Sequence, residues 1–349
     1  MTHRFSPQIV SKICVESHTF DLDFSKGAGW QGFLSCHVSG AVCLWSEAEE
    51  GSYILASCSQ HHRKSCRTVK FFPNGQRFVT GSADGSCLVI DTNSRGLWSS
   101  STQVSNSDPV NVLCPIDTNT FISGRDSGIV QLWDVRQNSS CTTIQPYEEV
   151  VFAIQLDQQH HPNQALITSG DRLCLYNIRY PKMQLKTMSD EQETDLLSCA
   201  IVKNGSKVLC GTSSDGAICI FDWNNMSDMT DRIINHNVSV DHIIPFTTLE
   251  NNQDVIITSS GDGILRILTV FPHEVLCVIG MHNTSDESIE ALSMSKEKKY
   301  VVSAAHDETL VVHKLPTQQE LKEILAMDNG QRVKSNTPSS AKDDFFSDM

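Results

Sequence analysis

The chain has 349 residues, of which 39% are hydrophobic and 19% charged, and its formal net charge is −14 at pH 7. This composition is that of a globular protein long enough to bury a large core, in one domain or in several. The acidic balance disfavours non-specific binding to nucleic-acid phosphates unless a local basic patch exists.

The cysteines and the N-terminal segment favour a reducing compartment. Thirteen cysteines are scattered along the chain and no C-x-x-C pair occurs, so a disulfide framework and a structural zinc site are both disfavoured. The segment "MTHRFSPQIVSKICVESH" lacks the apolar centre of a signal peptide. No apolar run approaches the ~18 residues of a membrane span. We therefore expect a soluble intracellular protein without a membrane segment.

The first expected element is an apolar strand over residues 8–15, "QIVSKICV". After it, a turn followed by an apolar strand recurs seven times, as in "VSGAVCLWS" (38–46) and "DSGIVQLWD" (126–134). The copies are centred near residues 40, 85, 128, 171, 216, 263 and 308, which are 43 to 47 residues apart. A fixed period of this length indicates a repeat architecture.

The same positions are apolar in every copy. The second and fourth residues after each centre are apolar throughout, whereas the residue between them varies, as expected of a strand with one face in a core. Two further strands precede the turn, as in "TVKFF" (68–72) and "RFVTG" (77–81), and several copies show a fourth, as in "SYILAS" (52–57). Four strands per repeat predict an all-β fold, a seven-bladed β-propeller of four-stranded blades.

Closing such a ring requires an additional strand in the last blade. After His313 no strand follows within the repeat, whereas residues 8–15 precede the first full copy. We expect residues 8–15 to supply the outer strand of blade 7, because this joins the chain ends in one blade and leaves no central edge unpaired. The propeller domain would then span residues 1–315.

Residues 316–349 differ in composition and are expected to form a C-terminal tail. Leu321, Ile324 and Leu325 have helical spacing, which predicts a short amphipathic helix over residues 317–328 that ends at the Asn-Gly pair 329–330. The polar segment beyond it is expected to be disordered.

The tail ends in "DDFF" (343–346) followed by three residues. Adjacent phenylalanines in an acidic, disordered end suit a docking peptide, so Phe345 and Phe346 are candidate partner-binding residues. The alternative is that both rings rest on the propeller or have no role.

The period and the Leu-Trp-Asp ending of the third copy resemble the WD-repeat family, whose fold is a β-propeller. The Trp position is occupied in turn by Trp45, Ile90, Trp133, Tyr176, Phe221, Leu268 and His313. A large side chain there would pack between neighbouring blades.

Several stretches are similar to one WD-repeat subfamily, that of WD repeat-containing protein 55. They include "HHRKSCRTVKFFPNGQRFVT" (61–80), "DLLSCAIVKNGSKVLCGTSSDGAICIFDWNN" (195–225), "FPHEVLCVIGMH" (271–282) and the terminal "DDFF". The resemblance implies a non-enzymatic protein of the nucleus and nucleolus, with the cytoplasm as a further location. It also implies a role in ribosomal-RNA maturation and large-subunit assembly, with pre-ribosomal assembly factors as protein partners. We expect a monomeric propeller within a larger complex.

One group of candidate residues has an expected structural role. The turn aspartates Asp84, Asp126, Asp215, Asp262 and Asp307 resemble structural residues of the family. His62 and His282 stand where family histidines bond such an aspartate and brace the strands. A buried carboxylate needs hydrogen-bond partners, so this set needs no ligand to account for it.

A basic cluster interrupts the acidic chain at Arg63, Lys64, Arg67 and Lys70. Its first part lies in the loop entering blade 2, which would open beside the central channel. It is the best candidate for contact with RNA or an acidic partner, whereas the alternative is an ordinary solvated surface. Two more candidates, Arg125 and His306, directly precede turn aspartates and are expected to reach the same face.

The segment Trp133-Asp134-Val135-Arg136 has a second interpretation. It resembles the W-D-x-R box by which some WD-repeat proteins bind the adaptor of cullin ubiquitin ligases, and Arg179 repeats the arginine in the next copy. Both arginines would leave the third strand on the face opposite the basic cluster. Short motifs have many false positives, and Arg136 could be an ordinary loop residue.

The sequence holds no recognisable catalytic or metal-binding motif. G-x-S-x-G, H-E-x-x-H and Walker-type loops are all absent from it. The adjacent histidine pairs 61–62 and 160–161 would point to opposite faces of a strand, which is unsuited to chelation. We expect no cofactor, no metal and no enzymatic activity.

Overall fold

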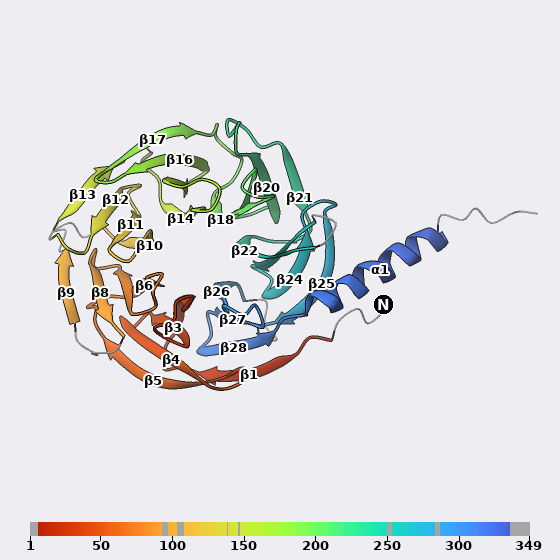
Figure 1. Cartoon of the computed structure of the whole chain (residues 1–349), viewed down its shortest axis with the longest axis horizontal. Coiled ribbons are helices and arrows are strands. Elements are labelled where there is room, and N and C mark those ends of the chain that lie inside the picture. The colour runs from red at the N-terminus through yellow and green to blue at the C-terminus, as the bar shows by residue number, and fades with distance from the viewer. Residues whose placement is uncertain are drawn as a thin grey trace, which may run out of the picture.

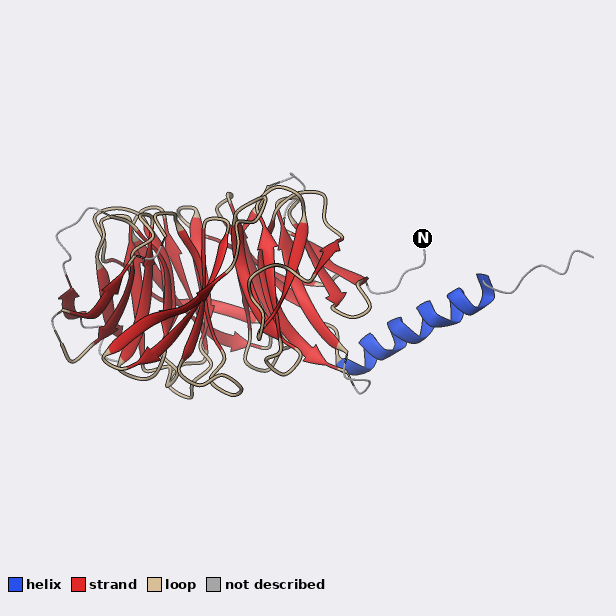
Figure 2. Ribbon diagram, turned by 90° about the horizontal axis from the view of Figure 1, so that it is seen from above, coloured by secondary structure: helices blue, strands red, loops and turns tan. Residues whose placement is uncertain are grey.

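The computed structural model describes residues 6–92, 97–102, 108–137, 139–145, 147–249, 253–282 and 287–335. Seven four-stranded antiparallel sheets are arranged in a ring around a central channel (Figure 1), and the ring is seen edge-on in Figure 2. The predicted all-β fold, a seven-bladed propeller, is therefore confirmed.

The strands of the first three blades follow one another in sequence. Blade 1 comprises β2 (Thr19–Phe24), β3 (Gly32–His37), β4 (Ala41–Glu49) and β5 (Ser52–Gln60). Blade 2 comprises β6 (Cys66–Phe71), β7 (Arg77–Ser82), β8 (Cys87–Asp91) and β9 (Leu97–Thr102). Blade 3 comprises β10 (Val110–Pro115), β11 (Thr120–Arg125), β12 (Val130–Asp134) and β13 (Ser140–Ile144).

The next three blades repeat this order from the channel outward. Blade 4 comprises β14 (Val151–Leu156), β15 (Gln164–Ser169), β16 (Arg172–Arg179) and β17 (Lys182–Met188). Blade 5 comprises β18 (Leu196–Val202), β19 (Lys207–Thr212), β20 (Ala217–Asp222) and β21 (Asp231–Ile234). Blade 6 comprises β22 (Val240–Thr248), β23 (Asp254–Ser260), β24 (Ile264–Thr269) and β25 (Glu274–Met281).

Blade 7 combines the two ends of the propeller. Its inner strands are β26 (Ile289–Met294), β27 (Tyr300–Ala305) and β28 (Thr309–Lys314), and its outer strand is β1 (Ile9–Cys14). β1 pairs antiparallel with β28, with Lys12 opposite Val311 and Ile13 opposite Leu310. The expected closure by an N-terminal strand is thus present.

The third strand of each blade holds the core together. Both repeated apolar positions on it are buried in all seven blades, from Val42 and Leu44 in blade 1 to Leu310 and Val312 in blade 7. The residue at the Trp position is also buried in every blade, which explains why it is large in each copy. Since neighbouring blades pack face to face, these side chains fill the space between sheets.

Three blades use the same polar contact at the Trp position. The indole Nε1 of Trp45 donates to Ser35 Oγ at 2.8 Å, and that of Trp133 donates to Ser123 Oγ at 2.9 Å. In blade 7 the ring of His313 takes the place of the indole, with its Nε2 3.0 Å from Ser303 Oγ. In each of these three blades, one nitrogen of the buried ring thus has its partner on the second strand of the same blade.

Buried histidines predict an acid-sensitive fold. Burial lowers the pKa of His313 to about 3 and that of His236 to about 4. In the unfolded chain these histidines have a pKa near 6.5, so below that pH the unfolded chain binds more protons than the folded chain. The free energy of unfolding therefore falls as the pH decreases. From pH 7 to pH 5 each ring should cost about 2 kcal/mol of unfolding free energy.

Urea unfolding at these two pH values measures that loss. The pKa of Asp307 is lowered, so its own effect on stability lies below about pH 4 and does not overlap. The lowered pKa values of His37, His61 and His282 add to the loss in the same window. His313→Gln should reduce the pH 7 to pH 5 loss by about 2 kcal/mol, and an unchanged loss would contradict the assignment.

The C-terminal helix α1 (Gln318–Ser335) begins close to the predicted position. Thr317 and Glu320 form a capping box, with Thr317 N donating to Glu320 Oε2 at 2.7 Å and Glu320 N donating to Thr317 Oγ1 at 3.3 Å. Leu321 and Ile324 are buried in the core cluster that contains Leu276 of β25.

The predicted end of this helix at residue 328 is wrong, because α1 passes through the Asn-Gly pair and extends away from the ring (Figure 2). A glycine costs only about 1 kcal/mol inside a helix and does not by itself end one. The predicted disorder is also wrong for residues 331–335, which form the end of α1. Residues 336–349, with Phe345 and Phe346, lie outside the described residues.

One cysteine pair departs from the expectation of free thiols. Cys43 on β4 and Cys58 on β5 are directly opposite in register and form a disulfide, whereas the other cysteines are free. Nothing in the spacing of the cysteines along the sequence indicated this pairing, because it depends on strand register.

Candidate functional site

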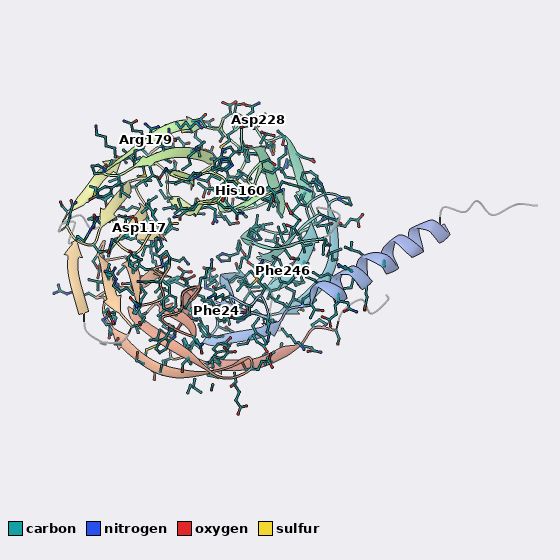
Figure 3. The ribbon with its side chains drawn as sticks, in the orientation of Figure 1. Phe24, Asp117, His160, Arg179, Asp228 and Phe246 are labelled. Carbon is teal, nitrogen blue, oxygen red and sulfur yellow. A yellow bond between two sulfur atoms is a disulfide. The ribbon has the colours of Figure 1, made fainter. Side chains whose placement is uncertain are left out.

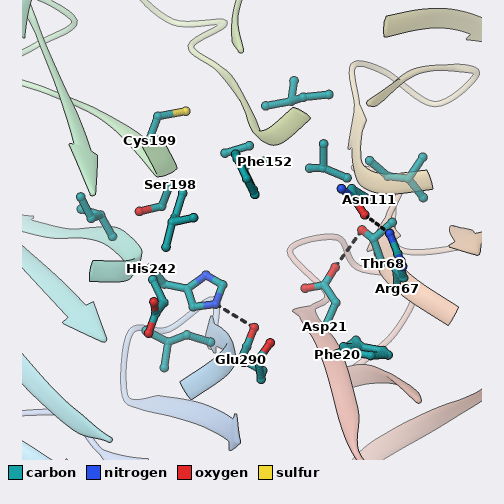
Figure 4. Close-up of a pocket in the computed structure, with 18 of the residues that line it drawn as sticks. Phe20, Asp21, Arg67, Thr68, Asn111, Phe152, Ser198, Cys199, His242 and Glu290 are labelled. Atoms are coloured by element: carbon teal, nitrogen blue, oxygen red, sulfur yellow. Dashed lines mark hydrogen bonds between the residues drawn. The ribbon is translucent and has the colours of Figure 1, made fainter. Parts of the chain in front are cut away.

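The inner strands of all seven blades line the central channel. The channel holds a cavity of about 590 Å³ whose lining combines charged, amide and aromatic side chains (Figure 4). We call the face that carries the turns between second and third strands the upper face. The opposite one is the lower face.

The turn aspartates close these turns on the upper face. The carboxylates of Asp84, Asp215, Asp262 and Asp307 each accept a hydrogen bond from the backbone N–H two residues further along, at 2.9 to 3.2 Å. This is the Asx-type contact that favours Asp in turns. Asp126 instead accepts two hydrogen bonds from the guanidinium of Arg67.

The two bracing histidines contact both the turn and the strand. His282 Nε2 is 3.0 Å from Asp307 Oδ1, and its Nδ1 is 2.8 Å from Ser303 Oγ. His62 Nε2 is 2.8 Å from Thr80 Oγ1, while its Nδ1 is 3.6 Å from Asp84 Oδ2. Each buried ring thus links the loop entering a blade to the second strand of that blade.

The basic cluster has two parts, because Arg67 and Lys70 lie on β6 whereas Arg63 and Lys64 lie in the loop before it. Lys70 Nζ contacts both carboxylate oxygens of Asp21 in blade 1 at 2.8 Å, and Arg67 Nη1 is 2.8 Å from Asp126 Oδ2 in blade 3. These two cations therefore join neighbouring blades. Arg63 and Lys64 are exposed on the upper face and pair with no carboxylate in the part of the chain that the structure describes.

Arg125 corrects the expectation of an exposed partner-binding residue. Its side chain is 1% exposed, and its guanidinium donates to Gln131 Oε1 at 2.8 Å and to the carbonyl oxygens of Asp108 and Gly85 at 2.7 and 3.3 Å. It is committed to joining blades 2 and 3 and does not reach the surface. His306 is exposed, with Nε2 2.9 Å from Glu290 Oε1.

The W-D-x-R segment forms a small network on the lower face. Trp133 and Asp134 are buried, whereas the Arg136 side chain is 64% exposed and forms two hydrogen bonds with Asp134, at 2.9 and 2.6 Å. This bidentate contact holds the pKa of Asp134 well below its usual range.

A residue of the next blade completes this network. Tyr180 donates its hydroxyl to Asp134 Oδ2 at 2.8 Å, and this bond raises the pKa of Tyr180 to about 12. Arg179, which precedes it, is exposed on the outer side of blade 4 (Figure 3). The two arginines of the proposed adaptor box are therefore both accessible.

Two further kinds of site concern metal ions and membranes. Within the described ranges, no three His, Cys, Asp or Glu side chains gather as they would around a metal ion. Over the same residues, no helix has the length and apolarity needed to cross a bilayer.

The closed ring of seven four-stranded blades and the repeated ring-packing positions define a WD-repeat β-propeller. A model of the WDR55 family matches residues 10–315, and the chain belongs to that family.

Curated relatives support this assignment. WD repeat-containing protein 55 of Arabidopsis thaliana is 33% identical over 309 residues, which is 88% of this chain and 81% of the relative. The mouse protein of the same name is 32% identical and covers 78% of this chain and 68% of its own. WD repeat-containing protein JIP5 of Cryptococcus neoformans is 30% identical, with 79% and 74% covered.

Proposed function

We propose that this protein is a non-enzymatic scaffold in the maturation of ribosomal RNA and the assembly of the large ribosomal subunit, in the nucleus and nucleolus. The family match over residues 10–315 supports this role, because the resemblance to WD repeat-containing protein 55 implies it. Its partners would be pre-ribosomal assembly factors. We further propose that residues 1–315 act as the propeller domain and residues 316–349 as an appended tail.

The observation that carries the proposal beyond the family match is the pair Arg63 and Lys64. Both are exposed in the loop that enters blade 2 on the upper face, without the carboxylate partners that hold Arg67 and Lys70. Exposed cations on an acidic protein can contact RNA phosphates or an acidic partner without general affinity for nucleic acid.

Depletion of the protein from cells is expected to raise the amount of unprocessed ribosomal-RNA precursors, measured by northern blot. Re-expressed wild type should restore processing and concentrate in the nucleolus, whereas Arg63→Ala/Lys64→Ala should restore it incompletely. The control is Lys182→Ala/Lys186→Ala, which removes two cations from the outer strand β17. Normal precursor processing in depleted cells would exclude the proposed role.

The accessible arginines of the lower face favour a second candidate, a substrate receptor of a cullin ubiquitin ligase. In that case wild type would capture the ligase adaptor in a pull-down, and Arg136→Ala/Arg179→Ala would lose it. The same variant should restore precursor processing fully if the ribosomal role is correct. A wild type that captures no adaptor excludes the ligase role.

A further inference from the structure

Every blade has an extra residue at the same place in its inner strand. On β2, Thr19 pairs with His37 and Asp21 with Cys36, so that Phe20 has no partner of its own on β3. The same single-residue bulge recurs in the other six inner strands. The seven residues, here named the bulge ring, are Phe20, Arg67, Asn111, Phe152, Leu197, Asp241 and Glu290.

The bulge ring lines the channel, and Phe20 also packs against the core cluster between blades 1 and 2. All seven of its residues line the central cavity and are partly exposed, whereas the residue before each is buried, as Val151 is before Phe152. A bulge re-aims one side chain while the rest of the strand keeps its pairing. The packing of the blades therefore does not determine which residue type occupies each of these seven positions.

The charges of the bulge ring are unevenly distributed. In blades 2 and 3, Arg67 donates to Asn111 Oδ1 at 2.6 Å and is neutralised by Asp126, so this side presents no unpaired charge. In blades 6 and 7, Asp241 and Glu290 place two carboxylates on neighbouring inner strands. Because Arg67 is paired and the carboxylates of Asp241 and Glu290 are on neighbouring strands, the bulge ring favours a positively charged ligand.

The partners of these two carboxylates include no lysine and no arginine. Asp241 Oδ2 accepts a hydrogen bond from Ser288 Oγ at 3.0 Å, and Glu290 Oε1 is 2.9 Å from the imidazole of the exposed His306. No Lys or Arg among the described residues forms an ion pair with either carboxylate. A cation entering from solution would thus find two acceptors that no lysine or arginine already holds, with the imidazole of His306 as the one basic group beside them.

Three of the other positions are apolar. In ring order Leu197 of blade 5 precedes Asp241 and Phe20 of blade 1 follows Glu290, while Figure 4 shows Phe152 of blade 4 projecting toward the channel, across from His242 and Glu290. A lysine or arginine carries an aliphatic stem below its charge, which can pack on apolar surface while the head reaches a carboxylate. An aromatic face also attracts a cation directly.

We infer that the bulge ring is the receptor for a peptide segment of a partner protein, with a lysine or arginine side chain inserted between Phe152 and the Asp241–Glu290 pair. This deepens the proposed scaffold function and rests on it, since it names the chemistry of a partner. A protein segment fits better than RNA, because a phosphate would meet the two carboxylates.

The inference is tested by measuring the binding of peptide libraries to the full chain by fluorescence polarisation. The peptides are capped, seven residues long, and differ between libraries only at the central residue. Libraries with central Arg or Lys should bind about tenfold more tightly than the Gln library, as expected for about 1.4 kcal/mol. Asp241→Asn/Glu290→Gln should abolish this difference. Glu148→Gln/Glu149→Gln, which removes two exposed carboxylates elsewhere on the upper face, should retain it.

A second variant separates binding from folding. Phe152→Ala should weaken Arg and Lys libraries alike, while its urea midpoint stays near that of wild type. The inference is overturned if no library binds, if the Gln library binds as well as the Arg library, or if single-stranded RNA binds the ring in place of peptides. Tight peptide binding together with normal precursor processing after depletion would refute the ribosomal role alone.

Discussion

Replacing Ile13 by proline is expected to lower the free energy of unfolding by about 3 kcal/mol or more, measured by urea unfolding. Val15 N–H donates to Glu308 O at 2.9 Å, and the alternation of an antiparallel pair places the Ile13 N–H in the same ladder toward β28. Proline removes that donor, and it also removes an apolar side chain that packs against the core between blades 7 and 1.

The neighbouring position provides the control. The same alternation turns the Lys12 N–H away from β28, so Lys12→Pro should cost clearly less than Ile13→Pro. Ile13→Val, which keeps the donor, should cost only about 0.5–1.5 kcal/mol. Equal losses for the two proline variants would mean that the β1–β28 ladder does not hold the ring closed.

Arg125→Met is expected to cost about 3 kcal/mol of unfolding free energy. The guanidinium is buried between blades 2 and 3, and its removal leaves the carbonyl oxygens of Gly85 and Asp108 and the amide oxygen of Gln131 without their donor. Buried acceptors left unpaired carry their full desolvation cost.

Two substitutions separate this effect from the loss of a charge. Arg67→Met removes a guanidinium that is about one-third exposed, so it should cost less than about 1 kcal/mol. Arg125→Lys keeps the charge but loses the planar fork, so it should lie between wild type and Arg125→Met. A loss for Arg125→Met no larger than that for Arg67→Met would show that the buried contacts contribute little.

The seven-bladed architecture could be predicted from the sequence because each blade repeats the same pattern of apolar residues. Val130, Leu132 and Trp133 recur in kind every 43 to 47 residues, and a recurring apolar pattern identifies the strand that faces the core. The missing outer strand of blade 7 followed from counting strands. These inferences need only the order of residue types along the chain.

The candidate site depends on pairing, which the order of residue types does not contain. Arg63, Lys64, Arg67 and Lys70 look alike in the sequence, yet Asp21 and Asp126, from other blades, neutralise two of them. The bulge ring was missed for the same reason, since an extra residue is visible only against its partner strand. In the sequence, the bulge ring is marked only by a repeat position at which the residue type varies. Phe152, Asp241 and the equivalent residues of the other blades have different side-chain types.

The pairing of β1 with β28 also has a consequence for synthesis on the ribosome. Ile13 and its partner Leu310 are separated by almost the whole propeller, so β1 cannot pair until β28 has been synthesised and has left the exit tunnel. At about 5–20 residues per second this wait is roughly 15–60 s. During that time six blades can form while the apolar strand β1 stays unpaired. We therefore expect chaperones that bind exposed apolar segments to bind the nascent chain.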